Sequence, residues 1–180
     1  MMTSTENRLS LKFIALFIPV AYVSYLFHEF GHWIVGEVLG NNMAYSLNNV
    51  WPKNGHYLDP GNDVLVTIGG PAFTILLSLV FLLVIERYKT IYAYPVVLFQ
   101  FVIRFVSLAV GGFVNQDEAR ISAILGLGTY TVAIIVLLIL FLMVIRASYL
   151  LKVDWKKNSY LFTVSVLCDL LVIGSSKLIS

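Results

Sequence analysis

Long apolar runs separated by short polar segments dominate the amino-acid sequence. The run over residues 9–27 holds a single Lys, and the run over residues 121–145 holds no Asp, Glu, Lys, Arg or His. A helix of about 20 apolar residues spans a bilayer, and backbone groups in lipid must pair within their own segment. The pattern therefore predicts membrane-spanning helices, and five are expected, over residues 11–39, 64–85, 94–114, 121–150 and 160–179.

The remaining segments are short and polar. Residues 1–10 are expected to form a tail before a retained helix, because the apolar stretch that follows is longer than the ~7–15 residues of a signal peptide. Residues 40–62 are rich in Asn, Gly and Pro, which is typical of turns, and carry the boundary-type aromatic residues Tyr45, Trp51 and Tyr57. This segment is expected to form either a hairpin or a re-entrant loop over a site. No linker divides the chain, so residues 1–180 are expected to form one all-α, polytopic membrane helix bundle.

The composition excludes several classes of function. The chain is 59% hydrophobic and 12% charged, whereas a soluble domain is about 45–50% apolar and about a quarter charged. The net charge is +2, and no Lys/Arg stretch is dense enough to follow a phosphate backbone. A soluble enzyme, a disordered regulator and a nucleic-acid binder are therefore excluded. The single cysteine, Cys168, allows no intrachain disulfide and is expected to be a buried structural thiol.

The loops differ in their basic residues, which predicts an orientation in the membrane. Eight basic residues lie on the side of the N-terminus: Arg8, Lys12, Arg87, Lys89, Arg146, Lys152, Lys156 and Lys157. The other side has only Lys53, Arg120 and Lys177. Because basic loops stay in the cytoplasm, the count places the N-terminus there.

The densest group of ionisable residues lies inside the first predicted span, in the sequence His28-Glu29-Phe30-Gly31-His32. On a helix, residues four apart lie about 40° apart in projection, so both imidazoles share one face. Two such imidazoles can bind one Zn²⁺, with Glu29 beside the open position as general base and acid. A buried polar network between helices is the alternative, because these groups cannot stay unpaired in hydrocarbon.

A catalytic zinc site of this kind needs a third protein ligand. Asp117 is the first choice because the third predicted span runs in the same direction as the first and carries Asp117 toward the same side. Glu118 and His56 are the next candidates. Asp59 and Asp63 lie close to the second predicted span, and Asp169 lies near the middle of the fifth, a more distant helix. Alternatively, Asp117 and Glu118 serve as N-terminal acids of the fourth predicted span.

With these motifs the chain resembles the site-2 protease family of intramembrane zinc metallopeptidases. The resemblance rests on His28-Glu29-Phe30-Gly31-His32 in a membrane helix, Gly69-Gly70-Pro71-Ala72-Phe73-Thr74 in the next, and Asp117 after a third. It covers about residues 20–120 and implies a catalytic three-helix core over about residues 11–120, followed by two further spans over 121–180. It implies Zn²⁺ held by His28, His32 and Asp117, with Glu29 as general base and acid.

The chain departs from the family pattern at several points. Thr74 stands where many members carry Asn, and Asn115-Gln116-Asp117-Glu118 replaces a motif in which Asp precedes Gly. Family members usually direct the metal-binding helix toward the cytoplasm, which would place this N-terminus outside, against the count of basic residues. We follow the count, because it uses the residues of this chain.

Small residues at membrane depth suggest either substrate contact or helix packing. Gly69, Gly70 and Pro71 are predicted to bind substrate if the backbone opens beside the metal and pairs with an extended peptide. Close helix packing is the equal alternative. Packing is also expected for two further glycine pairs, Gly111-Gly112 and Gly126-Leu127-Gly128.

One basic residue, Arg104, lies in the middle of the third predicted span and needs a partner there. Asp169 and Glu37 are the expected partners, in a structural pair, and Gln100 is expected to join it because it lies one turn earlier on the same face.

Two functions remain in competition. The first is a zinc metalloendopeptidase that cleaves a membrane-embedded protein substrate within the lipid bilayer. The alternative is a non-hydrolytic metal-binding membrane protein, such as a chaperone, transporter or scaffold. Di-iron lipid oxidation needs several His-rich motifs and is excluded, because the chain has 3 His.

Overall fold

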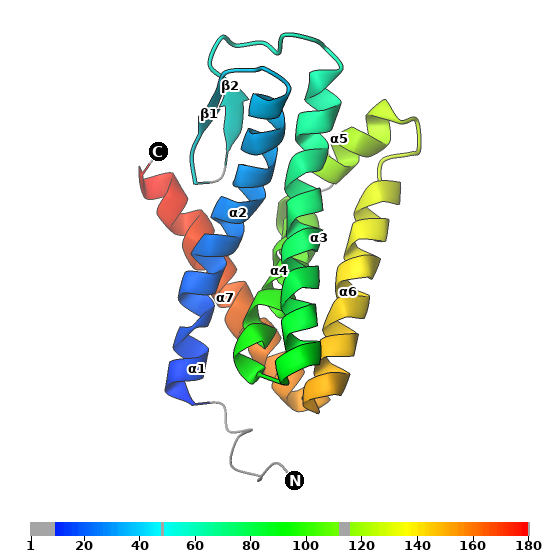
Figure 1. Ribbon diagram of the computed structural model, residues 1–180. Helices are drawn as coiled ribbons and strands as arrows, with labels where there is room; N and C mark the ends of the chain where they lie inside the picture. Colours follow the sequence, from blue (N-terminus) through cyan, green and yellow to red (C-terminus); the bar gives the residue numbers. More distant parts are fainter. Residues whose placement is uncertain (1–9, 48, 112–115, 180) are drawn as a thin grey trace.

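The computed structural model describes residues 10–47, 49–111 and 116–179. The elements along the chain are α1 (Leu11–Ala15), α2 (Phe17–Val38), β1 (Met43–Tyr45), β2 (Val50–Pro52), α3 (Asn62–Tyr88), the 3-10 helix η1 (Ile91–Ala93), α4 (Tyr94–Gly111), α5 (Asp117–Ile124), α6 (Thr131–Leu151) and α7 (Trp155–Ile179). Figure 1 shows the long helices packed side by side, with α5 and the two strands at the end of the bundle away from α1.

Five spans in the described part of the chain are long and apolar enough to cross a membrane. They confirm the prediction of an all-α, multi-pass membrane helix bundle. The first span covers residues 11–38 and joins α1 to α2, as the hydropathy pattern predicts. Their outward faces carry exposed Leu, Ile, Val and Phe side chains, which suits helices surrounded by lipid.

The predicted fourth span, residues 121–150, is wrong at its start. The helix α5 ends at Ile124, and α6 begins only at Thr131. Between them Gly126 and Gly128 adopt positive φ angles of 66° and 80°, a conformation that glycine reaches without steric cost. These two glycines therefore form a turn, and the prediction that they serve helix packing is also wrong.

The other predicted boundaries differ by smaller amounts. The third span was expected to reach residue 114, whereas α4 ends at Gly111 and residues 112–115 lie outside the described part, as do residues 1–9 of the predicted tail. The last helix begins at Trp155, five residues before the predicted start at 160. Cys168 is buried and free, as expected.

The polar segment after α2 contains a β-hairpin, which decides between the two expected forms. The strands β1 and β2 pair antiparallel, with Ala44 opposite Trp51. The Met43 amide of β1 donates to the Glu37 carboxylate at 2.8 Å, and the Tyr45 hydroxyl donates to the Leu26 carbonyl at 2.8 Å. Just before the hairpin, the Asn41 side-chain amide donates to the Gly36 carbonyl at 3.2 Å. The hairpin therefore lies beside the last turns of α2 (Figure 1).

The interior of the bundle is formed by α4 and by the contact between α2 and α3. An 18-residue stretch of the span that contains α4 is 67% buried, against 22% for the corresponding stretch of α6. Gly31 on α2 lies against Gly69 on α3 so closely that a Cβ atom added to Gly31 would lie 2.5 Å from the Gly69 carbonyl oxygen. Small residues let two backbones approach in this way, and this contact sets α3 directly beside the two histidines.

Candidate metal centre

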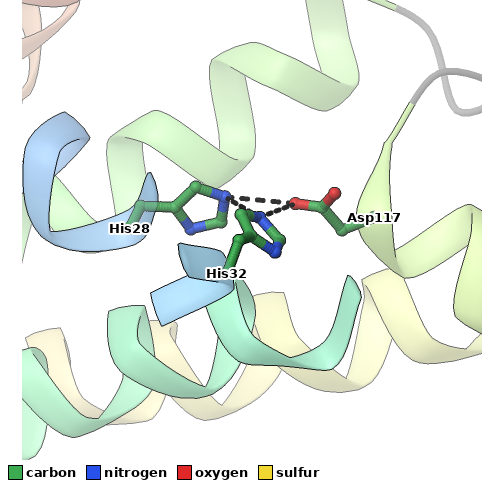
Figure 2. Close-up of side chains that lie close together, drawn as sticks. All are labelled: His28, His32 and Asp117. Atoms are coloured by element: carbon green, nitrogen blue, oxygen red, sulfur yellow. Dashed lines mark hydrogen bonds and ion pairs between the residues drawn. The ribbon is translucent and has the colours of Figure 1, made fainter. Parts of the chain in front are cut away.

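Three side chains from distant parts of the sequence meet between α2 and α5. His28 and His32 lie one turn apart on α2 and are both buried, and Asp117 is the first residue of α5. The Oδ2 atom of Asp117 lies 3.1 Å from Nε2 of His28 and 3.4 Å from Nε2 of His32, and the two Nε2 atoms are 3.2 Å apart. Figure 2 shows the three side chains pointing toward one another.

The outer nitrogens of both imidazoles are engaged by α3. Nδ1 of His32 lies 2.7 Å from the main-chain carbonyl of Val66, which can only accept, and 3.3 Å from the main-chain amide of Gly70, which can only donate. The contact with the carbonyl is much the shorter, so we assign the proton to this nitrogen. Nδ1 of His28 lies 2.9 Å from the hydroxyl of Thr74, and that hydroxyl donates its own proton to the Gly70 carbonyl at 3.1 Å. Nδ1 of His28 is therefore also a donor, and in both neutral rings Nε2 carries the free electron pair.

The converging atoms are thus two imidazole nitrogens and a carboxylate oxygen, all electron-pair donors. Two His and one acid form a ligand set found in catalytic zinc sites. Tetrahedral Zn²⁺ with bonds of about 2.0–2.1 Å holds its ligand atoms about 3.3–3.4 Å apart, and the three separations here are 3.1, 3.2 and 3.4 Å. The residues present therefore fit a zinc ion in both chemistry and spacing.

Asp117 supplies the one acidic oxygen of this group. An ionised carboxylate is the form that binds a metal ion.

Glu29 lies next to this face of α2. Its side chain is buried and leaves the helix about 100° around the axis from that of His28. The Tyr45 hydroxyl of β1 donates to the main-chain carbonyl of Leu26 at 2.8 Å, so the hairpin reaches the turn of α2 that precedes Glu29. Burial and the Glu29 carboxylate raise the pKa of Tyr45. Among the hydrogen bonds of the described residues, none involves the Glu29 carboxylate.

The structure corrects the expected partners of Arg104. Its Nη1 atom lies 3.3 Å from Glu118 and 3.7 Å from Asp117, rather than beside Asp169 or Glu37. Asp169 accepts a hydrogen bond from Tyr25, and Glu37 accepts one from Met43 in the hairpin.

The expectation that Gln100 joins Arg104 is also wrong. The Gln100 side-chain amide donates to Ser24 at 2.7 Å instead. This contact joins α4 to α2.

The other acids considered as ligands lie elsewhere. Glu118 is 1% exposed and pairs with Arg104, so it does not join the two histidines.

The remaining candidates lie at the surface. Asp63 pairs with Arg120 at 2.5 Å, and His56 is exposed in the segment before α3. Asp59 is exposed and accepts a hydrogen bond from Gly61. Within the described residues, the group of three ligand atoms is formed by His28, His32 and Asp117; Asn115 lies outside that part of the chain.

The glycines and proline predicted to contact substrate are buried in the middle of α3. The helix is continuous from Asn62 to Tyr88, so the backbone does not open at Pro71. Gly69 packs on Gly31, and a Cβ atom added to Gly70 would overlap the imidazoles of His28 and His32. Packing against α2 is therefore the role seen here, and substrate binding by Gly69, Gly70 and Pro71 stays a prediction.

Two supporting groups were not predicted from the sequence. The Val66 carbonyl is a backbone atom, and a backbone atom carries no sequence signal of its own. Thr74 did carry a sequence signal, because it is a polar residue inside a membrane helix. It also stands where many members of the resembled family have Asn.

Comparison of the chain with models of protein families, with curated proteins and with solved structures finds no match. The chemistry of the site is therefore inferred from its own side chains.

Proposed function

We propose that this chain is an intramembrane zinc metalloprotease, a zinc metalloendopeptidase that hydrolyses a peptide bond of a membrane-embedded protein substrate. The observation that carries the proposal is the meeting of three electron-pair donors, His28, His32 and Asp117, at separations of 3.1–3.4 Å. Those separations match the spacing of ligand atoms around tetrahedral zinc. Their position within a membrane bundle supports a substrate that is itself in the membrane.

Each residue of the site has a definable role in this reaction. His28, His32 and Asp117 would hold the zinc ion, which when bound supplies Lewis-acid activation of water and of the peptide carbonyl. Thr74 and the Val66 carbonyl keep both imidazoles in the tautomer and orientation that direct Nε2 inward. Glu29 accepts a proton from the attacking water and delivers it to the departing amine nitrogen.

The proposal includes an orientation. Figure 1 shows the ends of α3 and α6 and the start of α7 at the same end of the bundle as α1, and most of the basic loop residues belong to these segments. The N-terminus is therefore assigned to the cytoplasm, which directs α5 and the hairpin toward the opposite side. Cysteine labelling at positions 53 and 156 tests this, because only position 53 is expected to react from outside.

The function is tested by cleavage of a reporter membrane helix in proteoliposomes. Wild-type protein is expected to cleave the reporter, and Glu29→Gln is expected to lose cleavage while it retains zinc. Glu37→Gln is the matched control, because Glu37 lies two turns later on the same helix and contacts the hairpin; it is expected to retain cleavage. Normal cleavage by Glu29→Gln would contradict the proposal. Zinc binding without cleavage by the wild type would favour a non-hydrolytic metal-binding protein.

A further inference from the structure

Two neighbouring acids at the start of α5 share one buried cation from α4. Nη1 of Arg104 lies 3.3 Å from Oε1 of Glu118 and 3.7 Å from Oδ2 of Asp117. The same Oδ2 atom is the one that faces both imidazoles. A charged group therefore stands directly behind the third candidate ligand.

This arginine needs an anion wherever it lies in the bundle. Arg104 is 7% exposed and Glu118 is 1% exposed, and a buried charge is tolerated only when it is paired. Its shorter contact is to Glu118, which does not belong to the group formed by His28, His32 and Asp117. With its charge balanced by Glu118, Arg104 leaves the Asp117 carboxylate free to donate electrons to a cation.

We propose that Arg104 and Glu118 are positioning residues that set the zinc affinity of the site. Glu118 neutralises Arg104, so that the Asp117 carboxylate faces His28 and His32 without a competing cation. Two adjacent acids thus divide the work: Asp117 binds the metal and Glu118 balances the arginine. This inference rests on the zinc site of the proposed function and adds what controls its affinity.

Charge balance by Glu118 predicts a different result from an ion pair that only holds α4 and α5 together. In Glu118→Gln, Arg104 keeps its charge and has Asp117 as its remaining partner among the contacts described, so arginine and zinc compete for one carboxylate. In the double variant Arg104→Gln/Glu118→Gln the competing charge is gone as well. If charge balance controls the zinc affinity, the Arg104 substitution restores the affinity that Glu118→Gln loses. If the pair only holds the two helices together, the double variant binds zinc no better than Glu118→Gln.

The experiment measures the zinc dissociation constant of the purified full chain by competition with a chelator. Glu118→Gln is expected to weaken zinc binding by about 10-fold to 100-fold, the range for residues that support metal ligands. The double variant is expected to bind within about threefold of wild type, because it removes the competing charge together with its partner. Arg146→Gln is the control, because Arg146 pairs with Glu86 at a distance from the site.

The outcomes separate this inference from the proposed function. Wild-type zinc binding with an unchanged constant in Glu118→Gln overturns the inference and leaves the zinc site intact. Binding by the double variant that is weaker than by Glu118→Gln also overturns it. A wild-type chain that binds no zinc would overturn both. Replacing a buried ion pair as a whole is often neutral for stability, so the double variant is the one expected to fold even if Glu118→Gln does not.

Discussion

The Nδ1 atom of His32 donates to the main-chain carbonyl of Val66 at 2.7 Å, across the interface between α2 and α3. A carbonyl can only accept, so this contact favours a proton on Nδ1 over the longer 3.3 Å contact from the Gly70 amide, and the Nε2 electron pair then faces Asp117. Because Val66 offers a backbone atom, no side-chain substitution at that position removes the contact. The equivalent contact of His28 is made by the side chain of Thr74 and can be tested directly.

Thr74→Val is expected to weaken zinc binding by about 10-fold to 100-fold. Valine has nearly the shape of threonine but cannot accept the proton of His28 Nδ1, which lies 2.9 Å from the hydroxyl. The measurement is the zinc dissociation constant of the purified variant. Thr74→Ser, which keeps the hydroxyl, is the control and is expected to bind like wild type. Equal binding by the Val and Ser variants would show that the hydroxyl does not support the site.

Gly70→Ala is expected to abolish zinc binding. A Cβ atom at this position would overlap the imidazole rings of both His28 and His32, and the rings have no room to turn because α3 holds their outer nitrogens. Gly174→Ala on α7 is the matched control, because a Cβ atom there meets nothing within 4 Å. Zinc content of the two purified variants gives the comparison. Stoichiometric zinc in Gly70→Ala would mean that α2 and α3 are not as close as described.

Tyr25→Phe is expected to lower the free energy of unfolding by about 1–3 kcal/mol, the cost of leaving a buried polar group without its partner. The Tyr25 hydroxyl donates to Asp169 at 2.9 Å, and Asp169 is 1% exposed on α7. Tyr22→Phe, which removes a contact to the neutral Ser175 hydroxyl, is the control, with an expected loss of about 0.5–1.5 kcal/mol. Thermal unfolding in detergent compares the two, and a larger loss in Tyr22→Phe would contradict the assignment.

Much of the fold follows from the sequence because lipid imposes a simple rule on backbone groups. Apolar length locates the spans, and the spacing of His28 and His32 places both rings on one helix face. The direction of successive spans brings Asp117 to the same level of the membrane. Hydropathy could not reveal the turn at Gly126 and Gly128, because the apolar run continues through these glycines.

The partners of the buried polar groups were harder to predict. Arg104 needed an acidic partner. Glu118 is that partner because of how α5 lies against α4, and the order of residues along the sequence does not show how these two helices pack. Thr74 became meaningful only when α3 was seen to pack on α2 through Gly31 and Gly69. These contacts are properties of two elements together rather than of either sequence segment alone.

The most direct test of the metal site is the zinc content of the purified, folded chain. Wild-type protein is expected to hold one zinc ion per chain, Asp117→Ala to lose it, and Asp117→Glu to retain part of it. Folded wild-type protein without zinc would contradict the account, as would an Asp117→Ala variant that keeps its full zinc content while Glu118→Ala loses it.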